Sequence, residues 1–289
     1  MDIWSLIYLI LKISIYLVVF GTIGTELFYL HFNKILTDNT KEYCFSLKRK
    51  TAFSGVILSL ITFLFVAGSF GGNLANLFNP IILKLAGNSK AGYAALIMLT
   101  GFFFIILSSK KLRLISKELR FLGILLILLS FNITGHASNN GIVSQAFLNI
   151  HLIGISYWLG ALLPLKHICI KPFPEEKLYK IAHNFGVYAT GYVIFLLIAG
   201  AGLGYLLLEG NIQSLLTSSY GNILLLKISA VTVLLSVGAF NKIRLVPLLK
   251  KNLDTGAKKL NISINTEIIL VFIIIIMTSL LTTSIALPI

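Results

Sequence analysis

Apolar residues occur in long stretches that are separated by short polar connections. Eight of these runs approach or exceed the roughly 20 residues that a helix needs to cross the hydrocarbon core of a membrane. The runs lack the two-residue alternation of outer-membrane barrel strands, and a backbone in lipid must satisfy its own hydrogen bonds. The pattern therefore predicts an all-α polytopic membrane helical bundle of about eight transmembrane helices, at 4–30, 52–70, 91–108, 118–135, 143–165, 184–207, 222–241 and 267–287.

Composition supports the same class of protein. Apolar residues make up 57% of the chain and charged residues only 12%, and the mean hydropathy is +0.92. These values are not typical of a soluble globular domain. We therefore expect residues 1–289 to form a single integral membrane domain whose main partner is the lipid bilayer.

The basic residues predict an orientation. Most of the 24 lysines and arginines fall in four alternate connections, at 31–50, 109–120, 166–183 and 242–266. Positively charged connections face the cytoplasm, so both termini are predicted to lie outside. The net charge of +14 follows from this bias. It indicates attraction to anionic lipid rather than a nucleic-acid partner, and no nucleic-acid-binding module is visible.

Two histidines fall on the predicted outer side of one pair of runs. His136 lies at the outer end of the fourth run, and His151 lies eight residues into the fifth, about 12 Å deep at 1.5 Å per residue. Ionisable groups at membrane depth are candidates for a functional site. Asn132, Asn149 and Trp158 lie nearby and are predicted to shape a cavity. The alternative is that these residues make ordinary hydrogen bonds between helices.

Other polar and small residues in the runs suggest further roles. His167 and Cys169 lie at the cytoplasmic end of the run that carries His151 and could form an exit site, although so short a pairing also arises by chance. Gly154 and Gly160 are predicted to let a neighbouring helix approach closely. Glu26 is predicted to pair with a basic connection rather than to bind a metal.

Four segments together carry a resemblance to a known family. They are G-H-A at 135–137, I-H-L-I-G-I-S-Y-W-L-G-A-L-L-P-L at 150–165, S-L-L-T-S-S-Y-G-N-I-L-L-L-K at 214–227 and A-F-N-K-I-R-L-V-P-L-L at 239–249. In this order and at these separations they resemble the copper resistance D family of bacterial inner-membrane proteins. The resemblance covers about 130–250, the core region of that family.

The resemblance implies an eight-span protein that handles copper at the bacterial inner (plasma) membrane, moving it across, with import from the periplasm as the expected direction. It also implies a periplasmic copper-binding partner of the copper resistance C type. His136 and His151 are then the expected metal ligands, since imidazole suits copper. Lys227 matches a lysine of the family, but a cation beside copper is unfavourable. We therefore expect this intramembrane charge to reach the surface or to pair with Glu209.

Two other classes of function stay open. Histidines in a helical bundle can ligate haem, so a b-type haem electron-transfer protein is one alternative. A non-catalytic scaffold or sensor that recruits a partner through its basic connections is the other. The chain has only three methionines, so it lacks a chain of thioether copper sites. No phosphate loop or nucleophile motif is visible, and we predict that the protein is not an enzyme.

A weak internal similarity suggests a duplication. Residues 1–135 and 136–289 each hold four runs, and aligning Lys12 with His151 places Gly21 on Gly160. The stretch 87–93 resembles the stretch 217–222, each an outer connection with a glycine before an apolar run. An even number of spans in each half predicts two parallel four-helix repeats.

Overall fold

The computed structural model describes residues 3–72, 77–108, 116–135, 141–208, 211 and 213–283. Within these ranges the regular elements are all helical, which confirms the all-α class. They are α1 (Ile3–Phe32), α2 (Asp38–Gly71), α3 (Pro80–Asn88), α4 (Lys90–Leu107), α5 (Ser116–Ile133), α6 (Gly141–Ile170), α7 (Glu175–Leu207), α8 (Ser214–Thr217), α9 (Ser219–Phe240), a π-helix (Asn241–Leu245), α10 (Val246–Lys251) and α11 (Leu253–Thr283).

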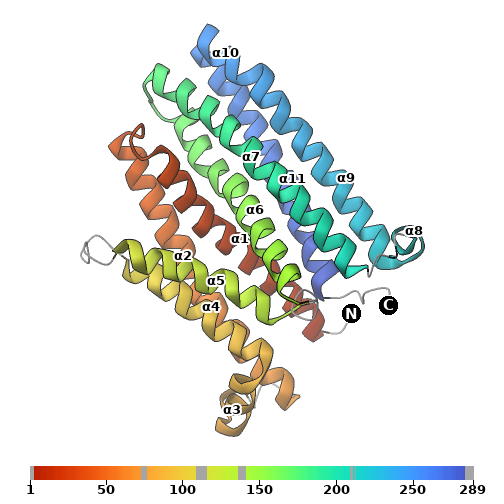
Figure 1. Cartoon of the computed structure of the whole chain (residues 1–289). Helices are drawn as coiled ribbons and strands as arrows, with labels where there is room; N and C mark the ends of the chain where they lie inside the picture. The colour runs from red at the N-terminus through yellow and green to blue at the C-terminus, as the bar shows by residue number, and fades with distance from the viewer. Residues whose placement is uncertain are drawn as a thin grey trace.

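The long helices form two groups that meet at α1 and α6 (Figure 1). Helices α2, α4 and α5 extend the bundle on the side of α1, whereas α7, α9 and α11 extend it on the side of α6. The start of α1 and the end of α11 lie at the same end of the bundle, because Lys12 Nζ donates to the carbonyl oxygen of Thr282 at 3.0 Å. This arrangement agrees with an even number of crossings.

Seven helical segments of the described chain are long and apolar enough to cross a membrane. They account for seven of the eight predicted runs. The run predicted at 118–135 forms α5, which has 18 residues and carries Lys117, Glu118 and Arg120 near its start. Because of these charges, α5 is not one of the seven candidate spans. It nevertheless packs beside α4 in the bundle (Figure 1).

Several helices extend well beyond the predicted runs. The structure begins α2 at Asp38, whereas the apolar run begins at 52, so most of the predicted 31–50 connection is helical. With 34 residues, α2 is about 51 Å long, compared with a hydrocarbon core of about 30 Å. Most basic residues of this connection therefore lie on α2, which is longer than the hydrocarbon core of a membrane is thick.

The stretches 87–93 and 217–222 form the same local structure. Ser89 Oγ accepts a hydrogen bond from the amide of Gly92 at 3.1 Å and caps α4. In the same way Ser218 Oγ accepts from the amide of Gly221 at 2.9 Å and caps α9. Each glycine also packs against a carbonyl of the preceding short helix, where no Cβ would fit. The two connections thus share a local motif, and the two repeats stay a prediction.

Close glycine contacts set the helix spacing in the core. A Cβ added to Gly24 of α1 would overlap the carbonyl oxygen of Ser156 and lie 2.5 Å from the Cα of Gly160 on α6. A Cβ added to Gly154 of α6 would lie 3.0 Å from the Cβ of Leu196 on α7. The prediction that Gly154 and Gly160 allow close approach is therefore confirmed. Backbones this close gain dispersion contacts, which stabilise helix association in lipid.

The π-helix has a cause in the sequence. Proline has no amide hydrogen and its ring clashes with the carbonyl four residues earlier, so Pro247 disturbs the end of the seventh predicted span. The amide of Val246 donates to the carbonyl of Asn241, five residues earlier, rather than to the one four residues earlier. This wider turn lets the helical rod continue from Ser219 to Lys251, and such turns are frequent at functional sites.

Candidate functional site

His151 lies on α6 and directs its ring against α7. Its Nδ1 is 3.2 Å from the carbonyl oxygen of Leu196. A carbonyl can only accept, so Nδ1 carries the proton and, in the neutral ring, Nε2 keeps its lone pair. Metal-binding histidines are oriented in this way, by a hydrogen bond from the nitrogen that does not bind the metal. His151 is therefore suited to bind a metal through Nε2.

The ring of His151 fits against α7 because residue 200 is a glycine. A Cβ added there would lie 3.2 Å from Cε1 and 3.3 Å from Nδ1 of His151. These separations are tighter than ordinary van der Waals contact, so a larger residue would push the ring away from α7. Gly200 therefore positions His151, a role that the sequence alone did not indicate.

The predicted partner of His151 is not placed by the structure. His136 lies outside the described residues. Asn132 of α5 and Asn149 of α6, which are predicted to shape the cavity, do lie within them. The Oδ1 atom of each is buried and has no hydrogen-bond partner in the described part of the chain. Leaving such an acceptor unpaired costs about 1–3 kcal/mol, so both amides can accept a bond from water or a cation.

A positive charge on Lys227 of α9 would act on the imidazole of His151, because charges are poorly screened inside the bundle. The described residues provide it with no hydrogen bond or ion pair, and Glu209, its predicted partner, lies outside them. A lysine near the candidate ligand opposes the binding of a metal cation there. A positive charge on Lys227 would therefore weaken a metal site at His151 rather than help to form it.

Trp158, predicted to shape the cavity, joins a buried polar network instead of standing alone. Its indole Nε1 donates to Oε2 of Glu267 on α11 at 2.8 Å, and its ring lies where a Cβ on Gly238 would clash. Asn241 Nδ2 donates to the other carboxylate oxygen at 2.5 Å, and Ser263 Oγ donates to Asn241 Oδ1 at 2.6 Å. The network ties α6, the π-helix and α11 together.

The sequence analysis missed three members of this network. Glu267 is 3% exposed, and no cation pairs with it among the residues that the structure describes. A single carboxylate at the start of the last apolar run was the signal that could have singled it out. Asn241 was visible only as part of the 239–249 motif, and Ser263 gave no signal of its own.

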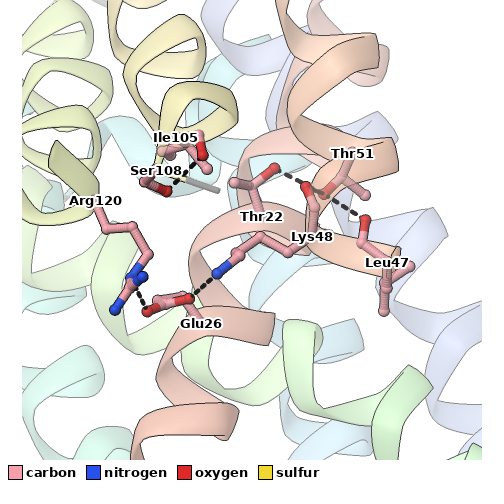
Figure 2. Close-up of polar contacts among 8 residues, drawn as sticks. All are labelled: Thr22, Glu26, Leu47, Lys48, Thr51, Ile105, Ser108 and Arg120. Carbon is pink, nitrogen blue, oxygen red and sulfur yellow. Dashed lines mark hydrogen bonds and ion pairs between the residues drawn. The ribbon is translucent and has the colours of Figure 1, made fainter. Parts of the chain in front are cut away.

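Glu26 forms a second buried polar centre, shown in Figure 2. Its Oε2 lies 2.5 Å from Lys48 Nζ of α2, and its Oε1 lies 2.8 Å from Arg120 Nε of α5. Near this centre, Thr22 Oγ1 donates to Thr51 Oγ1 at 2.8 Å and adds a link between α1 and α2. Both cations come from predicted basic connections, so the predicted role of Glu26 as their partner is confirmed. The carboxylate holds three helices together.

His167 and Cys169 lie near the end of α6, where each has its own surroundings. His167 stacks on Tyr43 of α2, with ring centroids 4.0 Å apart, and its buried Nε2 has no partner in the described part. Cys169 packs against the main apolar core. Side chains two residues apart on a helix point to different faces. The continuous helix therefore separates the two side chains, and the exit site remains a prediction.

The described residues contain no group of three or more His, Cys, Asp or Glu side chains that could hold a metal ion.

The fold and these sites define a multi-pass, all-α membrane protein with ionisable groups inside its bundle. Residues 179–281 match the family model described as Copper resistance protein D. This match supports assignment of the chain to that family and confirms the resemblance read from the sequence. A search of curated proteins and a search of solved structures gave no match.

The matched region differs in extent from the region that carried the resemblance. It includes Lys227, Asn241 and Glu267, and it ends well after 250. His136, His151 and Trp158 precede it. The family match and the helical bundle support a copper-resistance membrane protein. The match does not include the two histidines, so it does not test their roles.

Proposed function

We propose that this protein moves copper across the bacterial inner membrane and imports it from the periplasm in copper homeostasis or resistance. The observation that carries the proposal is the orientation of His151, whose Nδ1 is held by Leu196 so that Nε2 can bind a metal. Copper is the transported substrate. His136 is the proposed second ligand, and a pair of imidazoles suits copper.

Further features support a transient path. Asn132 and Asn149 offer unpaired oxygen atoms, and the charge of Lys227 near His151 favours release over tight retention. A periplasmic protein of the copper resistance C type is the proposed donor. Transport in this proposal needs no chemical reaction, so the copper gradient or the donor protein supplies the driving force.

Metal content is the first test. The protein is purified in detergent from cells supplied with copper and iron, and both metals are measured by elemental mass spectrometry. We expect copper in the wild type and its loss in a His136→Ala/His151→Ala double variant. His183→Ala is the matched control, because this exposed histidine lies near Tyr179 on α7, away from the proposed path.

The other outcomes separate the remaining classes of function. Iron with a haem absorption band in place of copper would establish the b-type haem protein. If neither metal is retained, copper uptake by cells expressing the wild type or His151→Ala decides between transport and scaffolding. Equal uptake by the two would contradict import through His151.

A further inference from the structure

His31 lies in a box of tyrosine rings near the predicted cytoplasmic end of α1. The centroid of its ring is 5.1 Å from that of Tyr157, 4.9 Å from that of Tyr188 and 6.0 Å from that of Tyr192. Tyr157 comes from α6, and the other two tyrosines come from α7. Two helices, α6 and α7, therefore place tyrosine rings around one imidazole of α1.

The imidazole of His31 is oriented in the same way as that of His151. Its Nδ1 is 2.8 Å from the carbonyl oxygen of Leu27, four residues earlier on α1. The carbonyl accepts, so Nδ1 carries the proton, and Nε2 of the neutral ring is available to a metal. Both histidines thus have one nitrogen fixed by a backbone carbonyl and the other available.

Tyr157 adds a second and independent indication of a ligand. Its side chain is fully buried at 0% exposure, yet its hydroxyl has no hydrogen-bond partner in the described part of the chain. A buried hydroxyl without a partner is costly, and a phenylalanine would fill the same space without that cost. The hydroxyl is therefore explained best by a partner that visits the box.

The box is connected to His151 along one face of α7. Tyr188, Tyr192 and Leu196 are spaced by four residues and share this face. The carbonyl of Leu196 holds His151, Tyr192 stacks on Tyr157 with centroids 4.0 Å apart, and Tyr188 contacts His31. Tyr157 itself lies six residues beyond His151, about 9 Å further along α6. A row of polar aromatic rings thus runs from His151 to His31.

We infer that His31 and Tyr157 form a second copper site, to which an ion bound at His151 passes on its way to the cytoplasm. This inference rests on the proposed copper transport. Nε2 of His31 and the hydroxyl oxygen of Tyr157 supply the donor atoms. The ring faces around them favour a cation through its attraction to the π electrons.

The test is a competition titration of purified protein with Cu(I) held by bicinchoninate. We expect His31→Ala to bind one copper equivalent fewer than the wild type and His151→Ala to lose a different equivalent. Tyr157→Phe should keep the fold and weaken the affinity of the second site for copper by about tenfold, equal to about 1.4 kcal/mol. His183→Ala, the control, should bind like the wild type.

The outcomes separate the two proposals. Wild-type binding by His31→Ala or by Tyr157→Phe overturns the second site, whereas wild-type binding by His151→Ala overturns the first. If His31→Ala fails to fold, Tyr157→Phe still decides, since it changes only the unpartnered hydroxyl. A ¹⁵N spectrum of histidine-labelled protein gives a second readout. Addition of Ag(I) should shift the Nε2 resonance of His31, and an unchanged resonance would contradict the site.

Discussion

The indole of Trp158 donates a hydrogen bond to the buried carboxylate of Glu267 at 2.8 Å and joins α6 to α11. The same carboxylate also accepts from Asn241 on the π-helix. Glu267 therefore has a hydrogen-bond donor on each of its oxygens and no cation partner in the described part of the chain. The stability of the bundle at this depth depends on those two neutral donors.

Replacement of Trp158 by phenylalanine should destabilise the protein. The change removes one donor and leaves Oε2 of Glu267 unpaired, which costs about 1–3 kcal/mol. Thermal unfolding in detergent measures the loss. Trp4→Phe is the control, because the Trp4 ring packs against Phe65 with centroids 5.2 Å apart and contributes mainly apolar contacts. Equal losses in the two variants would contradict a specific role for the Trp158 indole.

Glu26→Gln should be more damaging. The side chains of Glu26, Lys48 and Arg120 are only 4%, 10% and 17% exposed, so the variant leaves two cations inside the bundle without an anion. Removal of one partner from a buried ion pair costs about 3–5 kcal/mol. Chemical denaturation in detergent gives the difference in stability. Asp38→Asn is the control, since it removes only the exposed pair with Lys41 and should change stability little.

Gly24→Ala should force α1 and α6 apart. The new methyl group would overlap the carbonyl of Ser156 and the backbone of Gly160, and such overpacking costs about 1–3 kcal/mol. Gly191→Ala places a methyl group on α7 where no atom lies within 4 Å. The folded fraction of each variant after heating measures the effect. A loss in Gly191→Ala as large as that in Gly24→Ala would show that the glycine contact is unimportant.

Lys227→Gln should increase the affinity for copper. Removal of the positive charge that acts on His151 favours a cation there, by up to about tenfold or about 1.4 kcal/mol. The bicinchoninate titration reports the affinity, and Lys84→Gln serves as the control because Lys84 is exposed on α3. A weaker affinity in Lys227→Gln would instead show that the lysine supports the site.

Hydropathy predicted most of the fold because a membrane helix must be apolar over a fixed length. It did not predict where the helices end, since polar residues such as Asp38 and Lys41 continue α2 beyond the apolar run. It placed a span at 118–135, where α5 has three charges within its first five residues. One of them, Arg120, pairs with Glu26 of α1, and hydropathy cannot predict this contact between helices.

The candidate site was predicted less completely. Sequence reasoning singled out His151 and Trp158, because polar residues stand out in an apolar run. It could not show that Glu267 and Asn241 meet Trp158, since these residues are far apart in the chain. It did not single out His31. The tyrosines around it belong to α6 and α7, so only the packing brings the box together.

The contact between Glu26 and Arg120 has a consequence for how the protein is made. Arg120 lies near the start of α5, and its anionic partner is carried by α1, which precedes α5 in the chain and is therefore synthesised before it. The charge has a buried partner only when α1 already stands in the bilayer. We therefore expect α5 to insert late, together with α4, after α1 and α2 have packed against each other. The order of synthesis then matches the order in which the buried charges find their partners.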